Sequence, residues 1–276
     1  MFAASACFVT MAALIKTLGQ GLPLTELMFL RSFIALPVLL AIILHGGHPL
    51  IVRDWKRLLL RMLFGTTAMF CFYYALTHMP LADCVFIGRT QPLFLTLMAP
   101  FVVGEQGKKN VWIAIALGLA GTAMIMKPQV GWTLASSAAL TAAFLAALAH
   151  LMVRRLSQTE ATPVIVFNFT FLLCLISGLA TLATFRLPSY HQWLLLFSIA
   201  AFASLGQYLL TKAYSLDHAP TVAAASYASV VLSILYGYLF WNEMPSLTSV
   251  LGAFLIVCGG MYLMLSTLRV EYASSS

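Results

Sequence analysis

Long runs of apolar residues, separated by short breaks with Gly, Pro or charged residues, occupy most of the chain. A helix of roughly 20 apolar residues is long enough to cross the hydrocarbon core of a bilayer. The breaks define about ten such runs. They are residues 2–19, 24–44, 58–79, 81–103, 110–127, 133–152, 162–184, 193–214, 220–241 and 247–267. The longest connection, 45–56, leaves no room for a soluble catalytic domain.

The composition agrees with this pattern. Hydrophobic residues make up 62% of the chain and charged residues only 8%, whereas a soluble domain has about 25% charged residues. The sequence therefore predicts an all-α integral membrane protein in a lipid bilayer. The net charge of +7 does not indicate a nucleic-acid partner, because the basic residues lie singly or in small clusters at the ends of apolar runs.

Cysteine usage and the N-terminal run add two expectations. The five cysteines are scattered within apolar runs and have no C-x-x-C spacing, so we expect reduced thiols and no metal or cofactor. The first run has neither a basic segment before it nor a convincing cleavage site, so we expect it to be a span rather than a removed signal peptide.

The distribution of Lys and Arg predicts the orientation. If the N-terminus is cytoplasmic, the basic residues on the inner side are Arg53, Lys56, Arg57, Arg61, Lys108, Lys109, Arg154, Arg155, Lys212 and Arg269. Those on the outer side are Lys16, Lys127 and Arg186. Cytoplasmic loops carry an excess of basic residues, so both termini are expected in the cytoplasm.

An internal repeat divides the chain into halves. Tyr73–Pro80 corresponds to Ala213–Pro220 at an offset of 140, and Glu105 corresponds to Glu243 at an offset of 138. We expect a first repeat at 1–130 and a second at 131–276 with a short C-terminal tail, each with five spans. An odd number of spans places the repeats in opposite orientations, so the fold class is about ten transmembrane helices in two inverted five-helix repeats, an arrangement typical of secondary transporters.

The fourth run, 80–105, carries an arginine and a proline near its middle. Arg89 lies about 12 Å along a helix that begins at Leu81, well inside the bilayer. An arginine at that depth usually faces the bundle interior or an aqueous cavity, since exposing it to lipid costs about 3 kcal/mol. Pro92 is expected to kink the helix beside it.

The charges in the outer half of the first repeat do not balance. Lys16, Arg31 and Arg89 face only Glu26 and Asp83. If each acid pairs with a base, one cation is left for the carboxylate or phosphate of a substrate. In the alternative interpretation, Lys16 and Glu26 are interfacial, Arg31 extends its charge toward the surface, and Asp83 with backbone carbonyls neutralises Arg89.

Aromatic and amide side chains complete the candidate binding site. At the 138 offset Arg89 corresponds to Tyr227, so the two halves place an arginine and a tyrosine at equivalent positions near the midplane. The other candidates for substrate binding are Arg31, Tyr73, Tyr74, Gln91, Gln207 and Tyr208. A tyrosine in a bundle also commonly bonds a neighbouring carbonyl, which is the alternative for each. His150 is the candidate for coupling to protons.

Several of these features resemble the EamA-type carriers of the drug/metabolite transporter superfamily. They are the Glu26-to-Arg31 spacing, the tyrosine-to-proline junctions before the fourth and ninth runs, the endings VVGE and FWNE, and the glycines of the fifth and tenth runs. The resemblance covers nearly the whole chain. It implies ten helices in inverted repeats around a cavity lined mainly by spans one, three, four, six, eight and nine. Arg89 departs from the resemblance, because many relatives are expected to be uncharged there.

These observations favour a secondary active transporter that carries a small organic metabolite across the inner membrane by alternating access. An amino acid or another carboxylate-bearing or zwitterionic solute is the favoured substrate. The alternatives are an importer of a larger metabolite such as S-adenosylmethionine or riboflavin, an intramembrane enzyme, and a structural membrane subunit. No P-loop or HExxH pattern is present, so we do not expect an enzyme. The substrate, the direction of transport and the oligomeric state are not specified by the sequence.

Overall fold

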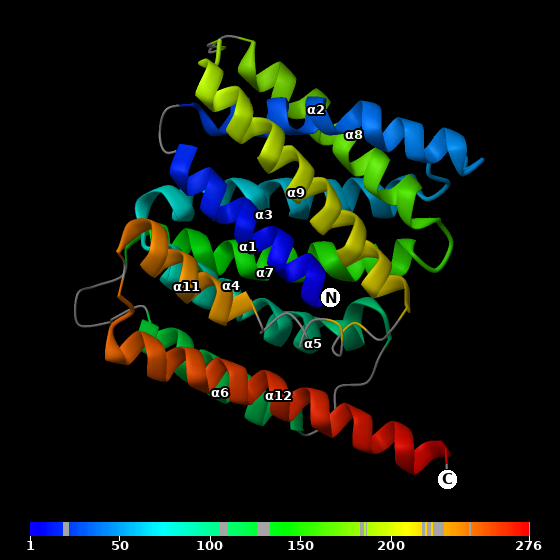
Figure 1. Cartoon of the computed structure of the whole chain (residues 1–276). Helices are drawn as coiled ribbons and strands as arrows, with labels where there is room; N and C mark the ends of the chain where they lie inside the picture. The colour runs from blue at the N-terminus through cyan, green and yellow to red at the C-terminus, as the bar shows by residue number, and fades with distance from the viewer. Residues whose placement is uncertain are drawn as a thin grey trace.

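The computed structural model describes residues 1–18, 22–104, 110–125, 133–182, 185, 187–216, 219, 222, 229–242 and 244–275. In these ranges every regular element is a helix, and the helices lie side by side as a bundle (Figure 1). Their bounds are α1 Phe2–Leu18, α2 Leu24–His45, α3 Trp55–His78, α4 Leu81–Gly88, α5 Gln91–Val102, α6 Asn110–Ile125, α7 Leu134–Leu156, α8 Thr162–Thr181, α9 Tyr190–Leu216, α11 Ser229–Trp241 and α12 Leu247–Ser275.

Six stretches of the described chain are long and apolar enough to cross a membrane. They are α2, α3, the α4–α5 stretch Asp83–Val102, α7, α8 and α9. Phe2–Leu18, Ala116–Ile125 and Leu247–Tyr262 are shorter apolar helices. The prediction of an all-helical integral membrane protein is thereby confirmed. The count of ten spans and the repeat boundary stay predictions, since residues 126–132 and most of 217–228 are outside the described ranges.

The start of α3 is set by a capping residue that the hydrophobic pattern does not show. Asp54 accepts a hydrogen bond from the backbone N–H of Arg57 at 3.1 Å, so the helix begins at Trp55. The apolar run predicted a start at 58. Counted from Trp55, Arg61 lies in the second helical turn, whereas a start at 58 would place it in the first.

The predicted kink in the fourth run is a complete break. Helix α4 ends at Gly88, and α5 starts at Gln91 with Pro92 in its first turn. The N–H of Thr90 bonds the carbonyl of Ile87 at 2.9 Å, which tightens the last turn of α4. Because proline has no N–H to donate, it suits the first turn of a new helix. Arg89 therefore lies between two helices rather than within one.

The most extensive helix contacts all join a helix before residue 126 to one after residue 132. They are α3 with α7, α6 with α12, α2 with α8, and α1 with α9. The α6–α12 pair is especially close: a Cβ on Gly121 would lie 2.5 Å from the carbonyl oxygen of Gly252. Small residues at a helix interface permit this close approach in a membrane.

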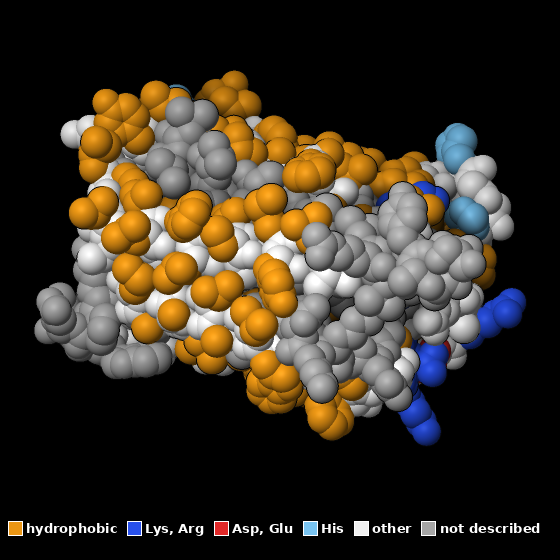
Figure 2. Space-filling view, turned by 90° about the horizontal axis from the view of Figure 1, so that it is seen from below, with side chains coloured by type: hydrophobic (Ala, Val, Ile, Leu, Met, Phe, Trp, Pro, Cys, Tyr) orange, Lys and Arg blue, Asp and Glu red, His pale blue; other side chains and the backbone are white. Residues whose placement is uncertain are grey.

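The two ends of the bundle differ in charge. Helix α1 begins, and α12 ends, on the side where the α2–α3 and α7–α8 connections lie (Figure 1). Viewed from below, apolar side chains spread along the bundle, whereas Lys and Arg side chains gather at this same end (Figure 2). Arg154 lies there and donates from Nη1 to the carbonyl of Tyr214 at 2.9 Å, which connects the ends of α7 and α9. We call this end the basic end.

Candidate functional site

A cavity of about 190 Å³ lies between α1, α2, α3, the α4–α5 break, α7 and α9. Its described polar lining residues are Ser5, Arg31, Arg61, Tyr73, Arg89, Gln91, His150 and Gln207. Three arginines from three different segments thus face one space, and none of the described lining residues is Asp or Glu. An arginine-rich space without carboxylates is suited to an anionic ligand.

The first arginine, Arg61, is on α3 and is 2% exposed. Its guanidinium lies against the ring of Phe169, with Cζ 4.0 Å from the ring centroid. In the described part of the chain it makes no hydrogen bond or ion pair, and its buried Nε has no partner. A buried charge with only an aromatic face beside it is costly. A ligand anion would supply the missing acceptor.

The second arginine, Arg31, is on α2 and is 7% exposed. Its Nη2 donates to Sδ of Met69 at 3.2 Å, and its Cζ lies 5.9 Å from the centroid of the Tyr73 ring. A thioether is a weak acceptor. Within the described residues Arg31 therefore has no strong acceptor, although it is nearly as buried as Arg61.

The third arginine, Arg89, follows the last residue of α4 and is half-buried. Two residues later, Gln91 Nε2 lies 2.9 Å from His150 Nδ1 on α7. The hydroxyl of Tyr214 lies 3.4 Å from the same His150 nitrogen. Because an amide nitrogen can only donate, Nδ1 is the acceptor in this arrangement. The α4–α5 break thus places a cation and a polar network on one wall of the cavity.

The remaining walls are apolar and use small residues where α7 passes the cavity. The lining includes Ala142, Ala143, Ala146 and Ala149 from α7, Phe8, Val9 and Met11 from α1, and Met1, which precedes α1. Helix α7 packs most extensively against α3. The short side chains of these alanines leave room for the cavity on the face of α7 that lines it.

The structure brings together five of the eight predicted site residues. Arg31, Tyr73, Arg89, Gln91 and Gln207 line the cavity. The role of these residues in substrate binding stays a prediction. Tyr227 lies outside the described residues.

Two predicted site residues are not among those that line the cavity. Tyr74 stacks on His78 with ring centroids 4.2 Å apart, near the end of α3. Tyr208 is partly exposed on α9. Successive residues of a helix point about 100° apart, so Tyr73 and Gln207 face the cavity while their neighbours Tyr74 and Tyr208 turn away from it.

Arg61 is the site residue that the sequence interpretation missed, since it was counted among the basic residues of the inner surface. A signal for it was present. The lining residues of α3 are three or four positions apart or adjacent in the sequence, so they form one face of the helix. They are Arg61, Gly65, Ala68, Met69, Phe72 and Tyr73. Asp54 is also a residue type that favours a helix start.

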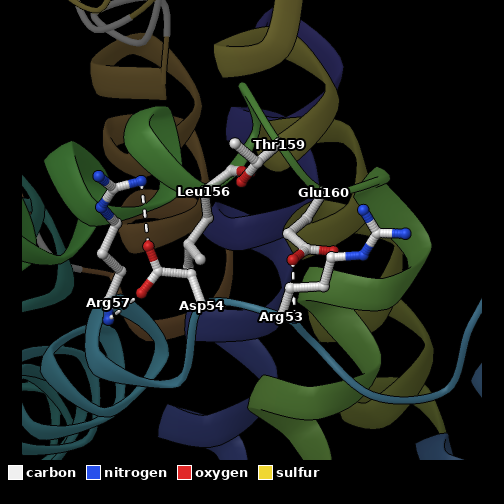
Figure 3. A network of polar contacts seen from close by, with 6 residues as sticks. All are labelled: Arg53, Asp54, Arg57, Leu156, Thr159 and Glu160. Atoms are coloured by element: carbon white, nitrogen blue, oxygen red, sulfur yellow. Dashed lines mark hydrogen bonds and ion pairs between the residues drawn. The ribbon is translucent and has the colours of Figure 1, made fainter.

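Polar contacts join the α2–α3 connection to the α7–α8 connection at the basic end, through residues that do not line the cavity (Figure 3). Glu160, in the α7–α8 connection, is 8% exposed and accepts a hydrogen bond from the backbone N–H of Arg53 at 2.7 Å. Nearby, the Asn168 amide donates to the carbonyl of Leu50 at 2.8 Å. Val52 is buried between them against Leu156 and α8. The α2–α3 connection is thereby held against the second half of the chain.

Comparison with known proteins identifies the family to which this bundle belongs. The EamA-like transporter family matches residues 1–127 and again residues 133–265. The chain belongs to the EamA-like transporter family. A solved crystal structure superposes on this EamA-like chain with a TM-score of 0.75 at 22% identity, covering 98% of this chain and 96% of the other, which shows the shared fold.

Several EamA-like relatives have names that state a transported compound. The chain is 32% identical to the pseudopaline exporter CntI of Pseudomonas aeruginosa strain UCBPP-PA14, over 92% of this chain and 90% of the relative. It is 27% identical to a riboflavin transporter of Brucella anthropi, over 88% and 89%. It is 25% identical to an S-adenosylmethionine uptake transporter of Rickettsia prowazekii, over 91% and 86%. The names agree on transport of small molecules and include both an exporter and an uptake transporter.

The recognition of an EamA-type carrier is thus confirmed, and the family indicates a transporter rather than an enzyme. The lining residues come from α1, α3, the α4–α5 stretch, α7 and α9, which correspond to the expected spans one, three, four, six and eight, and Arg31 is added from α2. The span numbers themselves stay a prediction. The central residues of span nine are outside the described ranges. Among the described residues, no three His, Cys, Asp or Glu side chains are grouped as a metal site requires.

Proposed function

We propose that this EamA-like protein is a secondary active transporter of a small organic solute that bears a carboxylate, with an amino acid or related zwitterion included in that class. One observation carries the proposal: Arg31, Arg61 and Arg89 line a single cavity whose described lining has no Asp or Glu. Guanidinium groups bind carboxylates with two parallel hydrogen bonds, which gives both affinity and orientation.

We also propose that transport proceeds by alternating access between two inverted five-helix repeats, 1–130 and 131–276. The helix contacts support this. If α1 corresponds to α7 and α3 to α9, as the expected repeats require, the contact of α3 with α7 in one repeat order becomes the contact of α9 with α1 in the other, and both contacts are present. In such transporters the site lies at the interface between the repeats, and a cavity lined by helices from both the earlier and the later part of the chain supports the proposal.

The proposed location is the bacterial-type inner membrane, with both termini in the cytoplasm. The excess of basic residues at the basic end supports it, because cytoplasmic segments are enriched in Lys and Arg. We expect a reporter fused in the Arg53–Arg57 connection to be cytoplasmic and one fused at Ser189 to be external. If the Ser189 fusion reported the cytoplasm, the inverted arrangement would be wrong.

His150 is the proposed site for a coupling proton. It lines the cavity, contacts Gln91 and Tyr214, and shares the space with Arg61 and Arg89. A proton on His150 would compensate part of the charge of an anion bound beside it. In proteoliposomes, an imposed pH gradient should drive uptake by the wild type and not by His150→Gln; equal driving in both would remove His150 from this role.

The substrate class is tested by a thermal-shift screen of the purified protein against carboxylates, amino acids, nucleosides, vitamins and cationic amines. A ligand that binds the folded state raises the melting temperature with its concentration, so even a weak substrate is detected. Carboxylates should raise Tm, and amines of the same size should not. Stabilisation only by cationic or uncharged compounds would contradict the proposal.

The second candidate function is transport of a larger metabolite, and the relatives named for riboflavin and S-adenosylmethionine favour it. The aromatic side chains of Phe8, Phe72 and Tyr73 in the lining could hold a ring system. Riboflavin and S-adenosylmethionine belong in the same screen. A Tm increase with either, and none with small carboxylates, would select this function.

A further inference from the structure

We propose that the transported solute carries two anionic groups, such as the two carboxylates of an extended dicarboxylate, and that Arg61 binds one while Arg31 binds the other. This rests on the proposed function and makes its substrate class more specific. The two arginines come from different helices, face one cavity, and are both more than nine-tenths buried.

Arg61 provides the first binding point. Its guanidinium is in contact with Phe169 on one side and borders the cavity, and in the described chain it has neither a hydrogen bond nor an ion pair. Contact with an aromatic face offsets only a small part of the free-energy cost of burying a charged group. The protein therefore keeps a desolvated cation that an arriving carboxylate would neutralise.

Arg31 provides the second binding point. Its described contacts are the sulfur of Met69 and the face of Tyr73, neither of which carries a negative charge. Its Nε is buried without a hydrogen-bond partner. Gln207 lines the cavity too, and with Arg31 it also lines a smaller adjoining space. A carboxylate here could accept from the guanidinium, with the Gln207 amide available nearby as a second donor.

The distance between the guanidinium groups of Arg61 and Arg31 can be estimated from the α3 residues that each one contacts. The Arg61 side chain runs along the helix to Gly65, where an added Cβ would collide with its guanidinium. The Arg31 guanidinium is placed by its contact with Met69, four residues farther along. At 1.5 Å per residue, four residues correspond to roughly 6 Å along the axis of α3. A solute with two anionic groups separated by a short linker would reach both.

One anionic group would leave this arrangement incomplete. Two cations that share a poorly solvated space repel each other, and a single carboxylate placed at one of them leaves the other buried without a counter-charge. Two carboxylates neutralise both. The apolar side chains of Ala142, Ala146 and Phe72 in the same lining suit the hydrocarbon linker of such a solute.

The test measures how binding depends on the separation of two carboxylates. Purified protein is titrated calorimetrically with succinate, glutarate, adipate, suberate and sebacate, and with a monocarboxylate matched to each in carbon number. We expect a dicarboxylate of intermediate length to bind about tenfold or more tightly than its matched monocarboxylate, because it gains a second charge-assisted interaction.

Variants show which residues cause the preference. Arg61→Gln and Arg31→Gln should each reduce dicarboxylate affinity by about tenfold or more, to near that of the monocarboxylate. Gly65→Ala should weaken it in the same direction, because the new methyl group displaces the Arg61 guanidinium without removing its charge. Arg53→Gln is the matched control: it removes an exposed arginine whose contact to Glu160 is made by the backbone, and it should keep the preference.

Each outcome has a defined meaning. If monocarboxylates bind as tightly as dicarboxylates, or if Arg61→Gln and Gly65→Ala both retain the preference, the inference is wrong while the proposed carboxylate transport stands. If no carboxylate binds and other compounds do, the proposed substrate class fails, and this inference fails with it. Melting temperatures of the ligand-free variants confirm that each compared sample is folded.

Discussion

Arg89→Ala is expected to lose carboxylate binding by about tenfold or more while the protein still folds, because a guanidinium group that faces the ligand contributes charge-assisted hydrogen bonds. The backbone at this position tolerates the change: φ is −71° and ψ is −3°, which alanine adopts readily. Arg89→Lys should retain part of the affinity, since an ammonium keeps the charge but not the planar pair of donors.

Affinity and melting temperature should be measured together on both Arg89 variants. We expect Arg89→Ala to bind carboxylates more weakly than wild type with the same melting temperature in the absence of ligand. Arg89→Lys should have an intermediate affinity. A destabilised Arg89→Ala protein whose folded fraction binds carboxylates as tightly as wild type would show that Arg89 is structural. In that case Arg31 and Arg61 alone would form the anion site.

Glu160→Ala is expected to lower the stability of the folded bundle by about 1.5–3 kcal/mol. The buried carboxylate accepts a 2.7 Å hydrogen bond from the N–H of Arg53, and its removal leaves that N–H without its acceptor (Figure 3). Arg57→Ala is the comparison. It breaks the neighbouring Arg57–Asp54 pair at 3.1 Å, whose side chains are 35% and 30% exposed, and such pairs contribute at most about 1 kcal/mol.

Chemical denaturation of the two variants in the same detergent decides this point. We expect Glu160→Ala to be less stable than Arg57→Ala. Equal stability of both variants, or a smaller loss for Glu160→Ala, would mean that the α2–α3 connection is held mainly by the burial of Val52 and not by the hydrogen bond.

Much of the fold was predictable because hydrophobicity alone determines where a chain enters a bilayer. The helical class and the approximate position of each described span follow from the apolar runs. The residues at which each helix begins and ends are harder to predict from hydrophobicity. Polar residues can belong to a helix when a capping residue stabilises its end. With Asp54 as its cap, α3 begins at Trp55, three residues before the apolar run, and Arg61, which was expected at the inner surface, is buried and lines the cavity.

Parts of the candidate site could be predicted from single residues, because a charge or a proline within a span is informative without knowing which helices pack beside it. Arg89 and Arg31 could be singled out because charges are rare within spans, and Pro92 marked the break. Which face of a helix points inward depends on packing against helices distant in sequence. The local pattern therefore could not separate Tyr73 from Tyr74, or Gln207 from Tyr208, and only the three-dimensional arrangement did so.

The central claim is that a carboxylate solute crosses the membrane through the cavity lined by the three arginines. The most direct test is counterflow in proteoliposomes with a radiolabelled dicarboxylate, the best binder of the series, for wild type, Arg61→Gln and Arg53→Gln at equal protein content. Wild type and Arg53→Gln should accumulate label against an unlabelled internal pool, while Arg61→Gln should be near empty liposomes. Equal counterflow in Arg61→Gln and wild type would contradict the account.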